Sequence, residues 1–213
     1  MPAEHPLTFY TANTPNGQKV GIYLHEANLP HRQVVLDLNR GDQHRPDYLA
    51  INPNGKIPAI VDHAHGFTVF ESGAILSYLS ARHGHLHPAM PTEQWQVQQW
   101  LHFQIGGIGP MLGQLWWFLH ASPHQNREAI QRYTKEALRL CGVADQRLAE
   151  SAYLALNDYS IADIAAFPWL RTHAELQLDL SPYPRLRRWL EQIESRPAVQ
   201  QALAAARLDP AEA

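Results

Sequence analysis

Glu71 and Ser72 form a dipeptide with the chemistry to hold both charges of an amino-acid head group. The run 68–70 predicts a short strand, and the apolar residues of 74–79 recur at helical spacing, so a helix is expected over 72–82. Ser72 is expected to cap this helix, whose first amides attract a carboxylate. The Glu71 carboxylate can accept hydrogen bonds from an ammonium group. Taken alone, an ordinary capped helix with an exposed glutamate is the simpler explanation of the pair.

The elements that must position this dipeptide fit an α/β domain at the start of the chain. Strands are predicted over residues 7–10, 33–38, 57–61 and 68–70. A first helix is expected after Thr14, a side chain suited to an N-cap, with Pro15 at the first helical position. A short helical turn through Tyr48 follows the second strand, and a hairpin turn at 62–66 joins the last two strands. The predicted order is βαβαββα, and its first βαβ unit is expected to have parallel strands.

The rest of the chain is expected to be helical. Residues 84–92 contain Gly, Pro and His without periodicity, and we expect them to link a domain over 1–83 to an all-helical domain over 93–213. Three glycines and a proline within 106–110 interrupt one long predicted helix. Because an internal glycine costs about 1 kcal/mol and a proline about 3 kcal/mol, we expect a kink and a cavity there. The apolar run 115–118 is a candidate for one wall of a substrate pocket, although aromatic residues at helical spacing more often form a core.

Two features of the helical part predict structural rather than chemical roles. Ser160 and Asp163 have the spacing of a capping box, so Asp163 is expected to stabilise the fold and not to act as a catalytic acid. Cys141 falls on the apolar face of a helix predicted over 130–148. We therefore expect its thiol to be buried and unreactive.

Composition and charge exclude several classes of function. The 213 residues suffice for one large domain or two small ones, with 45% hydrophobic and 17% charged residues. A formal net charge of −3 gives no electrostatic reason to bind nucleic acid or an anionic membrane. No apolar run reaches the ~18 residues of a membrane span, and residues 1–6 lack a signal-peptide pattern. The single cysteine, Cys141, cannot form an internal disulfide, which favours a reducing, cytoplasmic location.

The 13 histidines raise the question of a metal site. Two groups are closely spaced in predicted loops, namely His63 with His65, and His83 with His85 and His87. Neither group has a cysteine or an acidic triad nearby, whereas a structural zinc site normally has four well-placed ligands. We therefore expect no metal site.

Pro58 opens the third predicted strand, and with the order βαβαββα this resembles the thioredoxin-like domain of the glutathione transferases, in which that proline is cis. Two motifs carry the resemblance further. Asn-Pro-x-Gly-Lys-Ile-Pro-Ala-Ile at 52–60 and Phe-Glu-Ser-Gly-Ala-Ile at 70–75 resemble the glutathione site of that family. The resemblance implies a bound glutathione, reduced or oxidised, as a cosubstrate.

The same resemblance implies a role for each matched residue. Glu71 would hold the ammonium group of the γ-glutamyl residue, and Ser72 would hold its carboxylate. Ile57 would offer backbone groups to the cysteinyl segment, and Lys56 would lie near the glycyl carboxylate. The glycine end has two further candidates, Gln43 and Arg40.

A thioredoxin-like reductase carries Cys-x-x-Cys where this chain has Thr14-Pro15-Asn16-Gly17. The chain cannot cycle a disulfide there, so the reactive sulfur is expected to belong to a bound thiol. A thiol with a pKa of about 8.5 is only about 3% ionised at neutral pH, and each unit of lowering requires about 1.4 kcal/mol. A helix N-terminus with hydrogen bonds from Thr14 and Asn16 would supply one or two units. Tyr10 is the alternative, since many glutathione transferases use a tyrosine near the first strand, but we expect it to be a strand core residue.

The motif Thr-Pro-Asn-Gly-x-Lys-Val at 14–20 and the glycine-rich segment 106–113 resemble the bacterial nu-class glutathione transferases. That class includes proteins that bind two glutathiones, or oxidised glutathione, and reduce disulfides. Its use of a threonine and an asparagine at the sulfur implies Thr14 and Asn16 as catalytic residues. It also implies that Arg132 contacts the carboxylate of a second glutathione, for which a solvated helix arginine is nearly as good an explanation.

The sequence thus predicts a cytoplasmic, homodimeric glutathione transferase of the nu-like type that reduces disulfide bonds with bound glutathione. Two alternatives remain open. One is a transferase that conjugates glutathione to a hydrophobic electrophile, and the other is a non-enzymatic regulatory or binding protein on the same fold. The intact residues Thr14, Pro58, Glu71 and Ser72 favour a working glutathione site over the second alternative.

Overall fold

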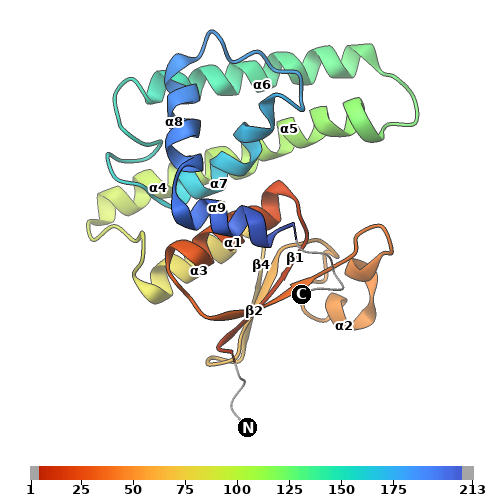
Figure 1. Cartoon of the computed structure of the whole chain (residues 1–213), viewed down its shortest axis with the longest axis vertical. Helices are drawn as coiled ribbons and strands as arrows, with labels where there is room; N and C mark the ends of the chain where they lie inside the picture. The colour runs from red at the N-terminus through yellow and green to blue at the C-terminus, as the bar shows by residue number, and fades with distance from the viewer. Residues whose placement is uncertain (1–4, 208–213) are drawn as a thin grey trace. The chain divides into compact units, whose positions relative to one another are not determined.

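The computed structural model describes residues 5–207, which fall into two compact units (Figure 1). The first unit contains the described residues up to His85 together with those from Arg196 onward, and the second runs from Leu86 to Ser195. Residues 1–4, on which the signal-peptide expectation partly rests, lie outside the described range. Residues 208–213, the end of the predicted helical domain, lie outside it as well. Within residues 5–207 no helix combines the length and the apolar character that a membrane crossing requires.

The first unit has the predicted order of strands and helices. Its elements are β1 (Leu7–Thr11), α1 (Pro15–Glu26), β2 (His31–Val35), η1 (Asp42–His44), α2 (Pro46–Leu49), β3 (Ala59–Asp62), β4 (Phe67–Phe70), α3 (Ser72–His83) and, from the end of the chain, α9 (Pro197–Ala205). The strands form one mixed sheet in the order β2-β1-β3-β4. β1 is parallel to β2 and antiparallel to β3, and β3 is antiparallel to β4. This is the thioredoxin-like arrangement expected from the sequence.

The first turn of α1 lies very close to the end of β1. A Cβ atom on Gly17 would clash with the Ala12 carbonyl and the Thr11 hydroxyl, so only glycine allows this approach. Further along α1, Gly21 lies against the ring of Phe9. Phe9 and Thr11 therefore face α1, and Tyr10, between them on the strand, faces the opposite side of the sheet.

The second strand was predicted over 33–38 but covers His31–Val35. Its register with β1 explains the shift, because Leu7 pairs with His31 and Thr11 with Val35, so pairing ends where β1 ends. Beyond it, the Asp37 carboxylate accepts hydrogen bonds from the backbone amides of the next turn, at residues 39–40. Residues 36–38 therefore lie outside the strand, although two of the three are leucines.

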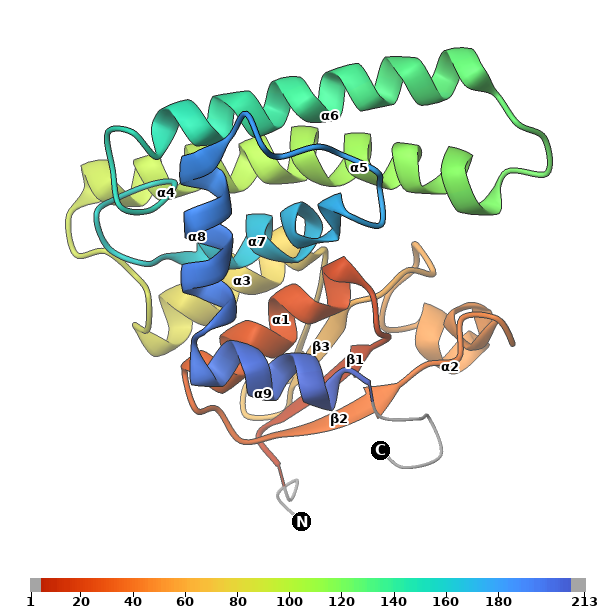
Figure 2. The same ribbon diagram turned by 45° about the horizontal axis from the view of Figure 1, so that its top comes forward.

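The last helix differs from the predicted domain division. α9 was expected within the helical segment 93–213 but packs along α1 in the first unit (Figure 2). The Ala202 methyl faces Gly21 of α1. At the last turn of α1, the Arg196 guanidinium forms a bidentate pair with the Glu26 carboxylate, at 2.6 and 3.0 Å. The small residues Gly21 and Ala202 let the two helices approach closely.

The second unit is helical, as predicted. Its elements are α4 (Pro91–Phe103), η2 (Gln104–Ile108), α5 (Gly109–Trp116), η3 (Trp117–Ala121), α6 (Arg127–Arg147), α7 (Ile161–Leu170), η4 (Arg171–His173) and α8 (Pro184–Glu194). Figures 1 and 2 both show α6 running alongside α5. The buried helix α7 packs against α4 and α8.

The predicted interruption of the long helix takes the form of a π-helical segment, η2, between α4 and α5. Glycines let α5 approach the indole of Trp169 on α7. A Cβ atom on Gly113 would lie 3.2 Å from that ring, and one on Gly109 would lie 2.8 Å from Gln104 Nε2. The glycines thus make room for side chains of the same unit, and the cavity expected beside this segment stays a prediction.

The capping box at the start of α7 is confirmed. Asp163 is fully buried, and its carboxylate accepts hydrogen bonds from the amide and the hydroxyl of Ser160, both at 3.0 Å. It also accepts from the Leu154 amide at 2.9 Å and from Trp189 Nε1 at 3.0 Å. The burial of Cys141 is confirmed as well, and it raises the pKa of that thiol to about 12.

Candidate functional site

One edge of the sheet gathers most of the residues singled out in the sequence. In the strand register Tyr10 pairs with Ala59, and Ala59 pairs with Phe70. The chain therefore leaves β1 toward α1, enters β3 after Pro58 and leaves β4 at Glu71 along the same edge. Neighbouring strands lie about 4.8 Å apart, so the starts of α1 and α3 flank the segment that contains Pro58.

The N-terminus of α1 is capped as predicted. Thr14 has an extended backbone, and its hydroxyl oxygen accepts a hydrogen bond from the Gly17 amide at 3.3 Å. Because the oxygen acts as the acceptor in this bond, the hydroxyl hydrogen can donate to a different group. Asn16 is the second residue of the helix. A half-buried hydroxyl at the positive end of a helix dipole suits a thiolate.

The N-terminus of α3 differs from the prediction. Ser72 is the first helical residue and not the N-cap; Glu71 occupies the N-cap position and its side chain makes no capping hydrogen bond. The Ser72 hydroxyl is instead the acceptor of a hydrogen bond from the ammonium group of Lys19, at 3.2 Å. Since neither side chain caps the helix, the first amides of α3 can serve a ligand carboxylate.

Glu71 has a strained backbone. Its φ of 70° and ψ of 117° lie where residues other than glycine are uncommon, and such conformations cost about 1–3 kcal/mol. Its side chain is exposed. Strain of this kind concentrates at ligand sites, where the surrounding structure holds a side chain in a position it would not otherwise take.

The segment before β3 is held by its own backbone. The Ile57–Pro58 peptide bond is cis, as the resemblance implies. The carbonyl oxygen of Lys56 accepts hydrogen bonds from the Tyr48 hydroxyl and from Asn52 Nδ2, each at 2.6 Å. The Lys56 side chain is exposed and Pro58 is buried. These two bonds hold the backbone that leads into Pro58.

Gln43 lies beside this segment. A Cβ atom on Gly55 would lie 3.3 Å from the Gln43 carbonyl, which places η1 next to the turn that leads to Lys56. Gln43 Nε2 donates to the Leu38 carbonyl at 3.3 Å, whereas its Oε1 is buried and has no hydrogen-bond partner among the described residues. An N–H group of a ligand would satisfy this oxygen. Arg40 has an exposed side chain.

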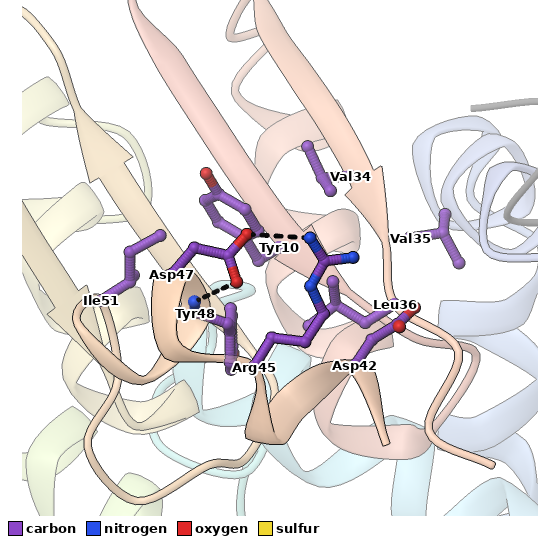
Figure 3. Close-up of a pocket in the computed structure, with 9 residues that line it drawn as sticks. All are labelled: Tyr10, Val34, Val35, Leu36, Asp42, Arg45, Asp47, Tyr48 and Ile51. Carbon is purple, nitrogen blue, oxygen red and sulfur yellow. Dashed lines mark hydrogen bonds and ion pairs between the residues drawn. The ribbon is translucent and has the colours of Figure 1, made fainter. Parts of the chain in front are cut away.

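The side chain of Tyr10 points away from the residues gathered at this edge. It lines a cavity of about 310 Å³ on the face of the sheet opposite α1, together with residues of β2 and α2 (Figure 3). The centroids of its ring and of the Tyr48 ring lie 5.7 Å apart. Burial raises the pKa of Tyr48 to about 12. Tyr10 is therefore a strand residue packed under α2 and is directed away from Thr14.

Arg132 lies in the second unit. It is exposed on α6, where its charge and, more strongly, a hydrogen bond from Arg139 lower the pKa of Glu136. Its contact with a second glutathione stays a prediction.

Two of the loop histidines have hydrogen-bond partners within the protein. His63 Nε2 lies 2.8 Å from the Thr8 hydroxyl, and His65 Nδ1 lies 3.0 Å from the Asp62 carboxylate. Over residues 5–207, no group of three or more His, Cys, Asp or Glu side chains is arranged to hold a metal ion.

Lys19 lies in the motif at 14–20, but the sequence analysis gave it no role of its own. Its side chain is only 1% exposed, and it reaches from α1 to the start of α3. Burial lowers its pKa to about 7, an effect that the nearby Glu71 carboxylate opposes. The position of Lys19 in the sequence gave a clue to its burial. Lys19 precedes the buried Tyr23 by four residues, so the two side chains share one face of α1.

Family models, related sequences and solved structures all place this chain among the same group of proteins. Residues 14–82 match the family model for the glutathione S-transferase N-terminal domain, and residues 108–197 match that for the C-terminal domain. The chain is 45% identical to the disulfide-bond oxidoreductase YfcG of Escherichia coli (strain K12), over 95% of this chain and 96% of that protein.

Two of the similar solved structures cover nearly all of this chain. One is a glutathione transferase of Burkholderia graminis with two glutathione molecules bound per subunit; its TM-score is 0.92 at 39% identity, covering 98% of this chain and 92% of that one. The other is a glutathione transferase of Pseudomonas putida with one glutathione disulfide bound per subunit; its TM-score is 0.88 at 38% identity, covering 95% of this chain and 93% of that one.

Proposed function

The chain belongs to the glutathione S-transferase family, and we propose that it uses bound glutathione to reduce disulfide bonds, in the manner of the nu class. The observation that carries the proposal is the start of α1. Thr14-Pro15-Asn16-Gly17 stands where a dithiol would have to be, and the one cysteine of the chain, Cys141, is buried in the other unit. A reductase built this way must take its thiol from a ligand. The name of the Escherichia coli relative and the glutathione disulfide in the Pseudomonas putida structure support this reaction.

The proposed reaction has two exchange steps. The thiolate of one glutathione attacks a sulfur of the substrate disulfide, forming a mixed disulfide and releasing one substrate thiolate, which takes up a proton. A second glutathione thiolate then attacks the glutathione sulfur of the mixed disulfide and releases the second substrate thiol. Two glutathiones become one glutathione disulfide, and the substrate gains two electrons and two protons.

Each part of the ligand has proposed contacts. Thr14 and Asn16 would stabilise the thiolate, and Glu71 and Ser72 would hold the γ-glutamyl ammonium and carboxylate. The uncapped start of α3 and the strained Glu71 backbone support the second assignment. The rest of the first glutathione would lie along Gln43, Lys56, Ile57 and Pro58. Arg132 would contact the carboxylate of a second glutathione.

The test of the reaction is a pair of steady-state assays, one with a model disulfide and one with a chlorodinitrobenzene-type electrophile. We expect glutathione-dependent turnover of the disulfide. Conjugation without disulfide reduction would replace the proposal with a conjugating transferase, and the absence of both activities in a protein that binds glutathione would indicate a binding protein.

Thr14→Ala is expected to lower kcat/KM for the disulfide by about 10- to 100-fold. The change removes one hydrogen bond to a charged sulfur, which contributes about 1.5–3 kcal/mol, and so raises the pKa of the bound thiol by one to two units. The measurement is the ultraviolet absorbance of the bound thiolate as a function of pH, together with kcat/KM.

Three further variants separate this effect from loss of the helix cap. Thr14→Ser keeps the cap and the hydroxyl and should retain activity. Thr14→Asp keeps the cap but cannot donate when ionised, so it should stay folded and lose activity. Tyr10→Phe is the control on the other face of the sheet and should be unchanged. Equal activity of the serine and aspartate variants would refute the role of Thr14.

We also propose that the protein is a cytoplasmic homodimer. The support for a dimer is large exposed side chains on both units, with Phe67 of the edge strand β4 51% exposed and Trp95 of α4 70% exposed. Sedimentation velocity at micromolar concentration should give twice the chain mass, and Trp95→Ser should shift the protein toward the monomer. A monomeric wild type would contradict the proposal. The free thiol of Cys141 supports a reducing compartment.

A further inference from the structure

Lys19 is a buried lysine, and the burial of its amine needs an explanation. Taking an ammonium group out of water costs several kcal/mol, and a well-packed apolar side chain in the same place is often neutral or stabilising. Lys19 is nevertheless only 1% exposed, on a helix packed against α3 and α9. A lysine at this position costs stability and therefore indicates a role other than filling space.

One contact of Lys19 points to that role. Its ammonium group lies 3.2 Å from the Ser72 hydroxyl oxygen, across 53 positions of the sequence. An ammonium group can only donate, so the serine oxygen accepts from it and the serine hydrogen must point elsewhere. At the uncapped N-terminus of α3, a serine hydrogen that points away from Lys19 can be donated to the carboxylate of a ligand. A neutral amine, by contrast, can accept from the hydroxyl and turn its hydrogen inward.

We propose that Lys19 is a positioning residue that orients the Ser72 hydroxyl and balances negative charge, so that the start of α3 receives the α-carboxylate of the γ-glutamyl group. This inference rests on the proposed function. Glutathione would bring its carboxylate next to that of Glu71, and two adjacent carboxylates repel unless a cation lies close by. Lys19 provides that cation from beneath the site.

The charges around Lys19 give the binding step a defined pH dependence. Burial lowers the pKa of Lys19 to about 7, and the Glu71 carboxylate at the N-cap of α3 acts in the opposite direction. On the side of α9, the ion pair of Glu26 with Arg196 lies seven residues further along α1, about 10 Å at the helical rise. A bound carboxylate stabilises the ammonium form, so the pKa of Lys19 rises on binding. Affinity for the ligand is therefore highest when Lys19 is charged and falls as the pH rises through about 7.

The experiment measures the affinity for S-methylglutathione by calorimetry at pH 6 and pH 8. The blocked sulfur of this ligand cannot ionise. The wild type should bind about five- to tenfold more weakly at pH 8. Lys19→Met should bind at least tenfold more weakly than the wild type at pH 6 and show no change between the two pH values. Lys135→Met, at an exposed position of α6, is the matched control and should behave like the wild type.

A second ligand separates orientation of the carboxylate from general support of the fold. The analogue γ-aminobutyryl-S-methylcysteinylglycine lacks the α-carboxylate and keeps the amine. Lys19→Met should not weaken its binding, and wild-type binding of it should not depend on pH between 6 and 8. Lys19→Met and Ser72→Ala should also be non-additive toward S-methylglutathione, because they remove the same interaction.

The outcomes distinguish this inference from the function on which it rests. Wild-type protein that binds no S-methylglutathione at either pH would overturn both. Wild-type binding that is independent of pH, or an equal loss of both ligands in Lys19→Met, would overturn the role of Lys19 and leave the glutathione site intact. If Lys19→Met does not fold, the wild-type pH profiles with the two ligands still decide the question.

Discussion

Replacing Asp163 with alanine is expected to lower the free energy of unfolding by about 3–5 kcal/mol. The carboxylate accepts four hydrogen bonds, from Leu154, Ser160 and Trp189, and thereby joins the preceding loop, the start of α7 and the helix α8. Removing it leaves buried donors unpaired, each at a cost of about 1–3 kcal/mol. Urea unfolding followed by tryptophan fluorescence measures the loss.

Asp158→Ala is the matched control for this change, since Asp158 is exposed and lies five residues earlier. It should alter stability by less than about 0.5 kcal/mol. A loss below about 1 kcal/mol in Asp163→Ala would contradict the structural role of the carboxylate.

The cost of losing Asp163 should also depend on pH. Burial raises its pKa from 3.8 to about 6, although its hydrogen bonds act in the other direction. Because the folded protein holds this proton more tightly than the unfolded chain, the contribution of Asp163 to stability is full below about pH 4 and is lost as the pH rises through about 6. The difference in stability between wild type and Asp163→Ala should therefore be larger at pH 5 than at pH 7. A constant difference would contradict the raised pKa.

Replacing Glu71 with alanine is expected to weaken glutathione binding by about 10- to 100-fold. The variant loses a charge-assisted hydrogen bond to the γ-glutamyl ammonium, which contributes about 1.5–3 kcal/mol. Glu191→Ala, at an exposed position of α8, is the control and should bind like the wild type. Calorimetric titration with glutathione measures the change, and unchanged affinity in Glu71→Ala would remove the head-group assignment.

The variant Glu71→Gly separates the effect of losing the carboxylate charge from the effect of backbone strain. It should lose the same affinity, yet it should be more stable than Glu71→Ala by about 1 kcal/mol, because glycine adopts a φ of 70° without steric cost. Thermal melts of the two variants test this expectation. If the glycine variant is no more stable than the alanine variant, Glu71 carries no backbone strain.

Features that depend on neighbouring residues could be predicted from the sequence. The order of strands and helices, the Thr14 cap and the Ser160–Asp163 capping box all follow from contacts within about four residues of one another. Such local chemistry acts the same way in most surroundings, so it can be predicted from types and spacing. The two motifs at 52–60 and 70–75 could be located in the same way, because each is a short continuous segment at one end of a strand.

The packing and hydrogen-bond partners of these residues became known only from the tertiary structure. β2 ends where β1 ends, α9 packs on α1 rather than with the other helices, and Glu71 takes the N-cap position that Ser72 was expected to hold. The Ser72 hydroxyl accepts a hydrogen bond from Lys19, a residue of the motif at 14–20 to which the sequence assigned no role. The physical reason is that burial and hydrogen bonding of a side chain depend on groups far away in the sequence. Lysine is ordinarily a surface residue, and only the folding of α1 against α3 turns Lys19 into a buried cation.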